Sequence, residues 1–228
     1  MEGNLAHVAR MIGDPARAEM LGALLGGEAL TSGELARRAG VAPATASEHL
    51  ARLVDGGLVV RRSSGRHRYY ALAGPDVAVA LEGLARISPD GGTAARRDSP
   101  EMQALRFART CYDHLAGGLG VRLADTLLER GFIAPDGFAV TDTGRDWLRT
   151  LDIDLDELRK GRRALTRQCL DWTERRDHLA GAVGAALASA MLERRWLVRI
   201  DGSRALRLTL RGREGLYRSL ALEIDTPS

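Results

Sequence analysis

The chain has 228 residues, of which 45% are hydrophobic and 28% are charged, and its formal net charge is +3. This length allows two modest domains with buried cores, and the charge is so mild that its distribution matters more than its total. No apolar run of 18 residues is present, which argues against a membrane span and a membrane partner. The N-terminus lacks the pattern of a secretory signal, and two cysteines do not make a disulfide framework. We therefore expect a cytoplasmic protein.

The first predicted helices lie in the N-terminal 40 residues. Residues 13–27 predict one helix, because Asp14 is suited to the N-cap position and a proline follows it at the first helical position. A second, shorter helix is expected over residues 30–40, with Thr31 or Ser32 as its cap and a glycine as its stop.

A third helix is predicted over residues 45–59, after a tight turn. Ala46, Leu50 and Leu53 are spaced for burial on one side of it. The opposite face is polar and carries Thr45, Ser47, Glu48, His49 and Arg52. Two short helices joined by a tight turn, with small polar residues opening the second, indicate a helix-turn-helix.

A basic hairpin is predicted next. Residues 58–72 contain two β-prone runs around Ser63-Ser64-Gly65. Four arginines and one histidine fall in this segment without an intervening acid: Arg61, Arg62, Arg66, His67 and Arg68. A helix-turn-helix followed by a basic hairpin is a winged helix.

This combination predicts binding to double-stranded DNA. Short polar side chains on a helix can reach base edges in the major groove, and arginines on a wing can neutralise phosphates or enter the minor groove. The predicted contact residues are Thr31, Thr45, Ser47, Glu48, His49, Arg52, Arg61, Arg62, Arg66 and Arg68.

Residues 5–86 resemble the ArsR/SmtB family of bacterial winged-helix repressors. The resemblance is carried by "GDPARAEMLGALL", "TSGELARRAGVAPATASEHLARLVDGGLV" and "RRSSGRHRYYAL". It implies a homodimer held by the first and last helices of this region, here about Leu5–Met11 and Asp76–Ile87. It also implies a palindromic operator and repression that a ligand relieves.

The resemblance further implies that Ser47, His49 and Arg66 face the DNA.

The sequence departs from the family at the two places where family members bind a sensed metal ion. Family members that sense thiophilic metals often carry cysteines in the helix before the recognition helix, but that helix here reads "ELARRAG". Others place Asp and His ligands on the last helix, which here reads "DVAVALEGLARI" and has no histidine. Neither metal site can be carried over, so any sensor is expected elsewhere.

The composition predicts a second domain. Residues 1–87 form the predicted winged-helix and dimerisation domain, and residues 88–98 form a linker rich in Gly, Pro and Ser. All three tryptophans and all three phenylalanines lie in residues 99–228, which indicates a separate core. The expected fold class is mainly α with small β-hairpin wings, and the second domain is α-rich.

The second domain contains an internal repeat. Residues 113–133 align without gaps on residues 177–197, and about half of the positions are identical. Each copy is followed by a hairpin signal and a T-x-x-G-R helix start. We predict two degenerate winged-helix-like units, at about 99–151 and 165–221, that pack about a pseudo-two-fold axis and sense an effector, support dimerisation, or do both.

The two cysteines lie near the repeated Asp-His sequence. Cys111 and His114 are three positions apart, which predicts that they share one face of a helix. Cys169 and His178 are nine apart, half a turn out of phase on a straight helix, so they converge only if the chain bends. Thiolates and imidazoles are ligands for soft or borderline metal ions.

Three interpretations of these residues remain open. The first is burial in a helix pair, with Gly117, Gly120, Gly181 and Gly184 at the crossing. The second is a pocket for a small-molecule effector between the repeats, and the third is a metal-ion or thiol-redox site. The effector candidates are Cys111, His114, Cys169, Trp172 and His178, and the metal candidates are the same residues without the tryptophan. The histidines align in the two copies, whereas the cysteines do not.

We therefore predict a dimeric transcriptional repressor whose C-terminal domain binds a small effector that lowers operator affinity. The alternative is a metal- or thiol-redox-responsive repressor that uses Cys111, His114, Cys169 and His178. We expect no enzymatic activity, because the sequence has no phosphate-cradling loop, nucleophile elbow or zinc-protease helix.

Overall fold

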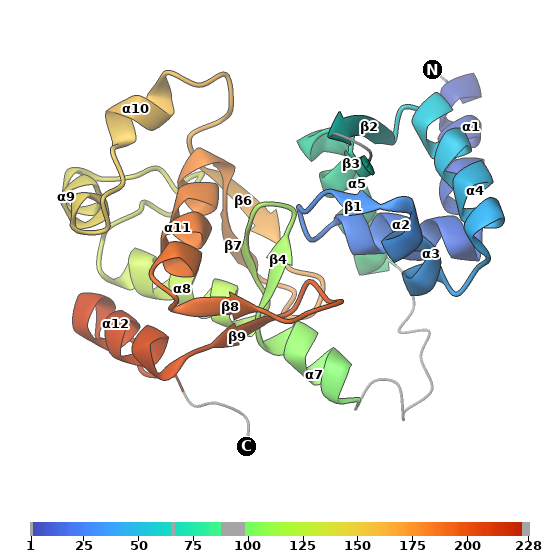
Figure 1. The fold of residues 1–228 in the computed structure, drawn as a ribbon. Coiled ribbons are helices and arrows are strands. Elements are labelled where there is room, and N and C mark those ends of the chain that lie inside the picture. Colours follow the sequence, from blue (N-terminus) through green and yellow to red (C-terminus); the bar gives the residue numbers. More distant parts are fainter. Residues whose placement is uncertain (1, 65–66, 88–98, 225–228) are drawn as a thin grey trace. The chain divides into compact units, whose positions relative to one another are not determined.

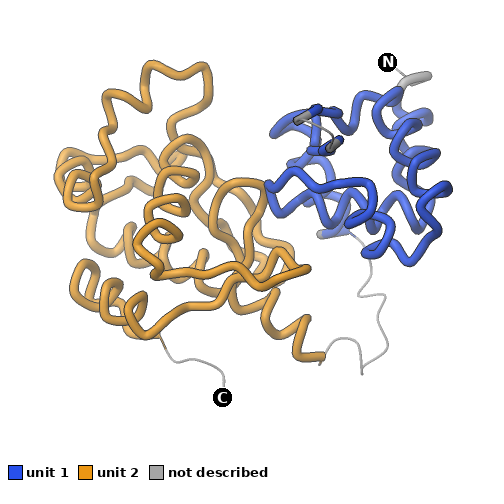
Figure 2. The backbone as a smooth tube through the Cα atoms, in the orientation of Figure 1, with its two compact units in different colours: residues 1–87 blue, residues 88–228 orange. Residues whose placement is uncertain are grey.

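The fold is described from a computed structural model of the chain. The structure describes three stretches of the chain, namely residues 2–64, 67–87 and 99–224. The chain divides into two compact units, residues 1–87 and 88–228, which Figure 2 draws in different colours. The expected linker lies outside the described residues, as does Arg66. Within the described stretches, no helix is long and apolar enough to cross a membrane.

Unit 1 is a helical domain with one small sheet (Figure 1). Its elements are α1 (Glu2–Ile12), α2 (Pro15–Leu24), β1 (Leu30–Thr31), α3 (Ser32–Ala39), α4 (Pro43–Asp55), β2 (Val59–Ser64), β3 (His67–Leu72) and α5 (Pro75–Ile87). The strands form one antiparallel sheet in the order β1-β3-β2. Helices α2, α3 and α4 pack against one another, and their buried leucines form the core. This is a winged helix-turn-helix.

The predicted helix boundaries of unit 1 are confirmed where the sequence carries its own start and stop signals. The Asp14 side chain caps α2 by accepting a hydrogen bond from the Arg17 N–H. Thr31 caps α3 in a reciprocal capping box with Glu34, and Gly40 ends that helix in the left-handed conformation. Helix α4 begins two residues earlier than predicted, because its proline occupies the first helical turn, and it ends four residues earlier, at Asp55, with Gly56 as its C-cap.

Unit 2 is built from three short hairpins and six helices within the described residues (Figure 1). Its elements are α7 (Pro100–Phe107), β4 (Arg109–Cys111), β5 (His114–Ala116), α8 (Gly118–Glu129), α9 (Asp142–Thr150), α10 (Leu155–Arg159), β6 (Arg167–Leu170), β7 (Asp177–Ala180), α11 (Gly181–Glu193), β8 (Leu197–Arg199), β9 (Leu206–Leu208) and α12 (Leu210–Leu220). One hydrophobic core runs through α8, α9, α11 and α12.

The helical interpretation of the Cys/His segments is wrong. Cys111 ends β4 and His114 begins β5, so the two residues face each other across a tight hairpin instead of sharing a helix face. Cys169 and His178 are likewise register partners in the β6–β7 hairpin. The chain therefore bends between each cysteine and its histidine, and each helix starts only after the second strand of its hairpin, α8 at Gly118 and α11 at Gly181.

The predicted role of the glycines as a helix–helix crossing is also wrong. Gly117 and Gly181 have φ angles of 80° and 89° and turn the chain from strand into helix. Gly120 and Gly184 lie in the first turns of α8 and α11, and a Cβ on either would come within 3 Å of the carbonyl oxygen of the strand residue five positions earlier. The glycines fit each helix closely against its own hairpin.

The T-x-x-G-R segments begin helices, as predicted. Thr141 caps α9 and Thr209 caps α12, and each hydroxyl accepts a hydrogen bond from a glycine N–H three residues later. A Cβ at Gly212 would lie 2.2 Å from the Trp196 carbonyl oxygen, so only glycine allows this helix to approach the preceding chain so closely.

Candidate functional site

The exposed face of α4 is the first candidate site. Ala46, Leu50 and Leu53 are fully buried against unit 1, so the helix can rotate little on its support. This leaves four of the predicted contact residues exposed on the helix: Thr45, Ser47, Glu48 and Arg52. The α4 face is short, polar and free of large apolar side chains, which suits entry into the major groove of DNA.

Two other predicted contact residues have structural partners. His49 is mostly buried, and its Nδ1 lies 3.2 Å from Arg17 Nη1 and 3.9 Å from an Asp14 oxygen. Arg17 is itself buried and donates to the Met11 carbonyl near the end of α1. The Thr31 hydroxyl is engaged in the capping box of α3. His49 was expected on the outer face, but it ties α4 to the junction of α1 and α2.

The wing provides the basic part of this surface. Arg61 and Arg62 on β2 and Arg68 on β3 are exposed. Ser63 pairs with Arg68 across the hairpin, so Arg61 and Arg68 project from the same face and Arg62 from the other. The wing therefore presents arginines on both of its faces, where they can neutralise phosphates.

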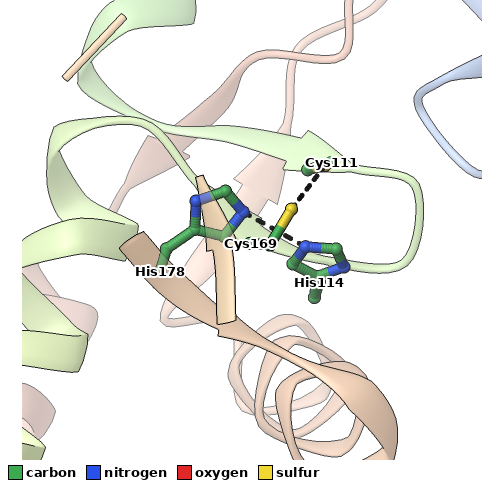
Figure 3. Close-up of side chains that lie close together, drawn as sticks. All are labelled: Cys111, His114, Cys169 and His178. Atoms are coloured by element: carbon green, nitrogen blue, oxygen red, sulfur yellow. Dashed lines mark hydrogen bonds between the residues drawn. The ribbon is translucent and has the colours of Figure 1, made fainter. Parts of the chain in front are cut away.

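The second candidate site is a cluster of four side chains in unit 2. Figure 3 shows Cys111, His114, Cys169 and His178 converging from the β4–β5 and β6–β7 hairpins. Their potential ligand atoms all lie within 4.8 Å of one another. The two sulfur atoms are 4.0 Å apart, and the two Nε2 atoms are 3.1 Å apart. Three of these residues are buried, and Cys169 is partly exposed.

A carboxylate lies behind each imidazole. His114 Nδ1 is 3.4 Å from Asp113 Oδ1, and the Asp113 carboxylate is bound by both terminal nitrogens of Arg163. His178 Nδ1 is 3.5 Å from Asp171 Oδ2. Each ring therefore turns Nδ1 toward an acid and Nε2 toward the centre of the cluster.

The second acid belongs to a buried ion pair. Asp171 and Arg109 are both fully buried, with 2.8 Å between Oδ2 and Nη2. The same oxygen accepts a 2.7 Å hydrogen bond from the Gly117 N–H, which lies at the start of α8. The Arg109 guanidinium also lies 4.8 Å from the centroid of the Trp172 ring, whose Nε1 has no hydrogen-bond partner among the described residues. Trp172 thus packs on the ion pair, and it is not one of the four converging residues.

The electrostatics of the cluster favour ionised groups. A hydrogen bond from Cys111 is the largest cause that lowers the pKa of Cys169; burial opposes it, and His114 and His178 lower the pKa further. Burial acts to lower the pKa of His114, but Asp113 and Cys169 outweigh it and raise that pKa. Burial acts to raise the pKa of Asp171, but the charge of Arg109 and the hydrogen bonds from Thr173, Gly117 and Arg109 together outweigh it and lower that pKa. A thiolate among imidazoles and carboxylates can bind a metal ion or react as a nucleophile.

Sequence reasoning singled out all four converging residues but did not identify the ion pairs that support them. Arg109, Asp171 and Arg163 belong to no sequence motif, and the contacts that join Arg109 to Asp171, Asp171 to Gly117 and Arg163 to Asp113 span 50 or more positions. The repeated Asp-His pair could have pointed to Asp113 as the acid beside His114, since Asp113 and Asp177 occupy equivalent positions in the two copies of the repeat. The acid that faces His178 is nevertheless Asp171 and not Asp177.

The fold and the exposed basic wing define a winged helix-turn-helix DNA-binding protein. Residues 12–62 match a family model described as a helix-turn-helix domain. The chain is 41% identical to the uncharacterized HTH-type transcriptional regulator YdfF of Bacillus subtilis, over 98% of this chain and 100% of that protein. The chain therefore belongs to the family of HTH-type transcriptional regulators.

Other similarities cover part of the chain. The HTH-type transcriptional regulator CmtR of Mycobacterium tuberculosis is 40% identical over 86 residues, which make up 38% of this chain and 72% of that protein. Among solved structures, reduced HlyU from Vibrio cholerae is 28% identical, with a TM-score of 0.35, and the match covers 38% of this chain and 90% of that one.

Proposed function

We propose that the chain is a dimeric repressor of the ArsR/SmtB type, which binds a palindromic operator through unit 1 and is released when unit 2 binds an effector. One observation carries this proposal: a DNA-binding winged helix shares its chain with a second unit in which two cysteines and two histidines converge, three of the four being buried. Polar and titratable groups are costly to bury unless they are hydrogen-bonded, paired or bound to a metal ion, so such a cluster points to a functional site.

The DNA-binding surface consists of the α4 face and the wing. Thr45 and Ser47 stand at the first turns of α4, where a recognition helix reaches base edges. Arg61, Arg62 and Arg68 on the wing neutralise phosphates. Phosphate contacts fix the register of the protein on the duplex, and the helix supplies the sequence preference.

Dimerisation through α1 and α5 is supported by exposed apolar side chains. Leu5 on α1 is 74% exposed and Ile87 at the end of α5 is 76% exposed. Val79 and Leu84, also on α5, are 40% exposed. Four of the seven large apolar side chains that are exposed in the described residues thus lie on these two helices. A two-fold axis through them presents two α4 helices to successive half-sites.

Unit 2 is proposed as a duplicated effector domain. Thr141 and Thr209 cap equivalent helices, and in each half a hairpin pairs one cysteine with one histidine. Two apolar cavities near α8 and α11 each have room for about one water molecule, which is too little for an organic effector. The Cys/His cluster is therefore the better effector site.

The DNA-binding part is tested by measuring binding to the DNA upstream of the protein's own gene at several salt concentrations. We expect specific binding that weakens as salt rises, and Arg68→Ala should weaken it on all sequences. Arg149→Ala is the matched control, since it removes an equal charge from an exposed residue of unit 2. Absence of specific binding, or equal losses in the two variants, contradicts the proposal.

A further inference from the structure

We propose that Cys111, His114, Cys169 and His178 form a tetrahedral centre for one zinc-type divalent ion per chain, and that this ion is the effector of unit 2. The second clause rests on the proposed function, whereas the centre itself can be tested without DNA. Neither metal site suggested by the family resemblance uses these residues, which all lie in unit 2.

The spacing of the donor atoms fits such an ion. Zn–S bonds of about 2.3 Å and Zn–N bonds of about 2.0 Å place the sulfur atoms of a tetrahedral site about 3.8 Å apart and the nitrogen atoms about 3.3 Å apart. The observed separations are 4.0 Å between the sulfurs and 3.1 Å between the Nε2 atoms. A disulfide needs its sulfur atoms about 2 Å apart, so the cluster is nearer to the geometry of a metal site.

The choice of donors selects the class of ion. Two thiolates and two imidazoles suit zinc, cadmium and cobalt(II), whereas calcium and magnesium require oxygen ligands. The nearby carboxylates do not compete as ligands, because Asp113 is bound by Arg163 and Asp171 by Arg109. The four converging atoms are therefore all sulfur or nitrogen.

The surrounding carboxylates orient the imidazoles. In metal sites, a ligating histidine commonly donates its second ring N–H to an acid, which fixes the tautomer and the plane of the ring. Asp113 lies 3.4 Å from His114 Nδ1, a long hydrogen bond, whereas Asp171 lies 3.5 Å from His178 Nδ1, which has no hydrogen-bond partner among the described residues. This leaves Nε2 of both rings for the ion. Asp113 and Asp171 are positioning residues and not ligands.

An ion at this place would join the two halves of unit 2. Each hairpin contributes one cysteine and one histidine, and β5 and β7 contact each other. Cys111, His114 and His178 are each at most 3% exposed, so the partly exposed Cys169 marks the side from which an ion enters and leaves. Binding would add four coordinate bonds to the existing contact between the hairpins.

The centre is tested by adding cobalt(II) to the full-length protein after chelator treatment and reduction. We expect one equivalent to produce the visible bands of a tetrahedral ion and the near-ultraviolet bands of thiolate-to-cobalt charge transfer, and zinc to abolish both. Cys169→Ser should weaken the charge-transfer bands, and His114→Gln should weaken binding. His7→Gln is the control, because His7 is an exposed histidine of α1.

A variant of a partly exposed residue distinguishes a loss of metal binding from a loss of folding. Asp113 is partly exposed, so Asp113→Asn should leave the fold intact and lower metal affinity about 10–100-fold, as is usual for supports of a ligating histidine. Asp146→Asn, an exposed acid of α9, should leave affinity unchanged. If cobalt fails to bind, or if Cys169→Ser retains the full charge-transfer signal, the centre is refuted.

Measuring operator affinity alongside zinc binding tests the effector role of the ion separately from the existence of the metal centre. If the wild-type protein binds zinc stoichiometrically and its operator affinity does not change, the ion is not the effector. If the reduced protein binds no metal but oxidation joins Cys111 to Cys169 with loss of two hydrogens, detected by mass spectrometry, a thiol-redox site replaces the metal centre.

Discussion

The buried ion pair beside the cluster gives the largest predicted effect on stability. Asp171 accepts hydrogen bonds from Arg109 Nη2 at 2.8 Å, the Gly117 N–H at 2.7 Å and the Thr173 hydroxyl at 2.7 Å. Asp171→Ala removes all of these and leaves the Arg109 guanidinium buried without a counter-ion. Breaking a buried pair in this way costs about 3–5 kcal/mol.

That loss is a large fraction of the 5–15 kcal/mol that stabilises a typical domain. It can be measured by urea unfolding of the chelator-treated protein, followed by tryptophan fluorescence. Since all three tryptophans lie in residues 99–228, the signal reports unit 2 alone. We expect a lower midpoint with an unchanged slope.

The matched control is Asp146→Ala, which breaks an exposed pair with Arg149 in the same unit. It should change the free energy of unfolding by less than about 0.5 kcal/mol, since exposed pairs contribute little. A loss below about 1 kcal/mol for Asp171→Ala would show that the Arg109 charge is solvated or paired otherwise, which would refute the reasoning.

Three smaller predictions concern local structure and DNA contact. Thr31→Ala should destabilise unit 1 by about 1 kcal/mol in thermal unfolding, because it removes the cap of α3. Hydrogen bonds from Thr31 lower the pKa of Glu34 below 4.5. The stability that these hydrogen bonds contribute is therefore present above pH 4.5 and is lost as the pH falls through the lowered pKa of Glu34. Arg62→Ala should reduce the slope of log affinity against log salt by about 1, and an unchanged slope would mean that Arg62 contacts no phosphate. Gly212→Ala should cost about 3 kcal/mol in urea unfolding, because its Cβ would clash with the Trp196 carbonyl; a cost below about 1 kcal/mol would mean that α12 shifts freely.

Unit 1 could be predicted well because its signals are local. Asp14 with the proline after it, and Thr31 with Gly40, define helix ends within a few residues of sequence. The outer face of α4 followed from helical spacing. His49 is the exception, because its partner Arg17 lies 32 positions away on another helix and no pattern announces that pair.

The cluster in unit 2 was only partly predictable. Strands of three or four residues are too short to show a reliable alternating pattern in the sequence, so the spacing at Cys111 and Cys169 was interpreted on a helix instead of a hairpin. Extended by two residues toward the N-terminus, the ungapped alignment also placed Cys111 opposite Arg175. The second hairpin has a longer turn than the first, and in three dimensions each cysteine pairs with the histidine of its own hairpin. An insertion in one loop therefore hid the equivalence of the cysteines.

The central claim is that occupancy of the Cys/His centre in unit 2 controls DNA binding by unit 1. The most direct measurement is the operator affinity of the wild-type protein and of Cys169→Ser, each with zinc and with chelator. We predict that zinc weakens wild-type binding by a factor between about 5 and 150, the usual range for coupled sites, and leaves the variant unaffected. Equal wild-type affinity in zinc and chelator, or the same response in the variant, would contradict the account.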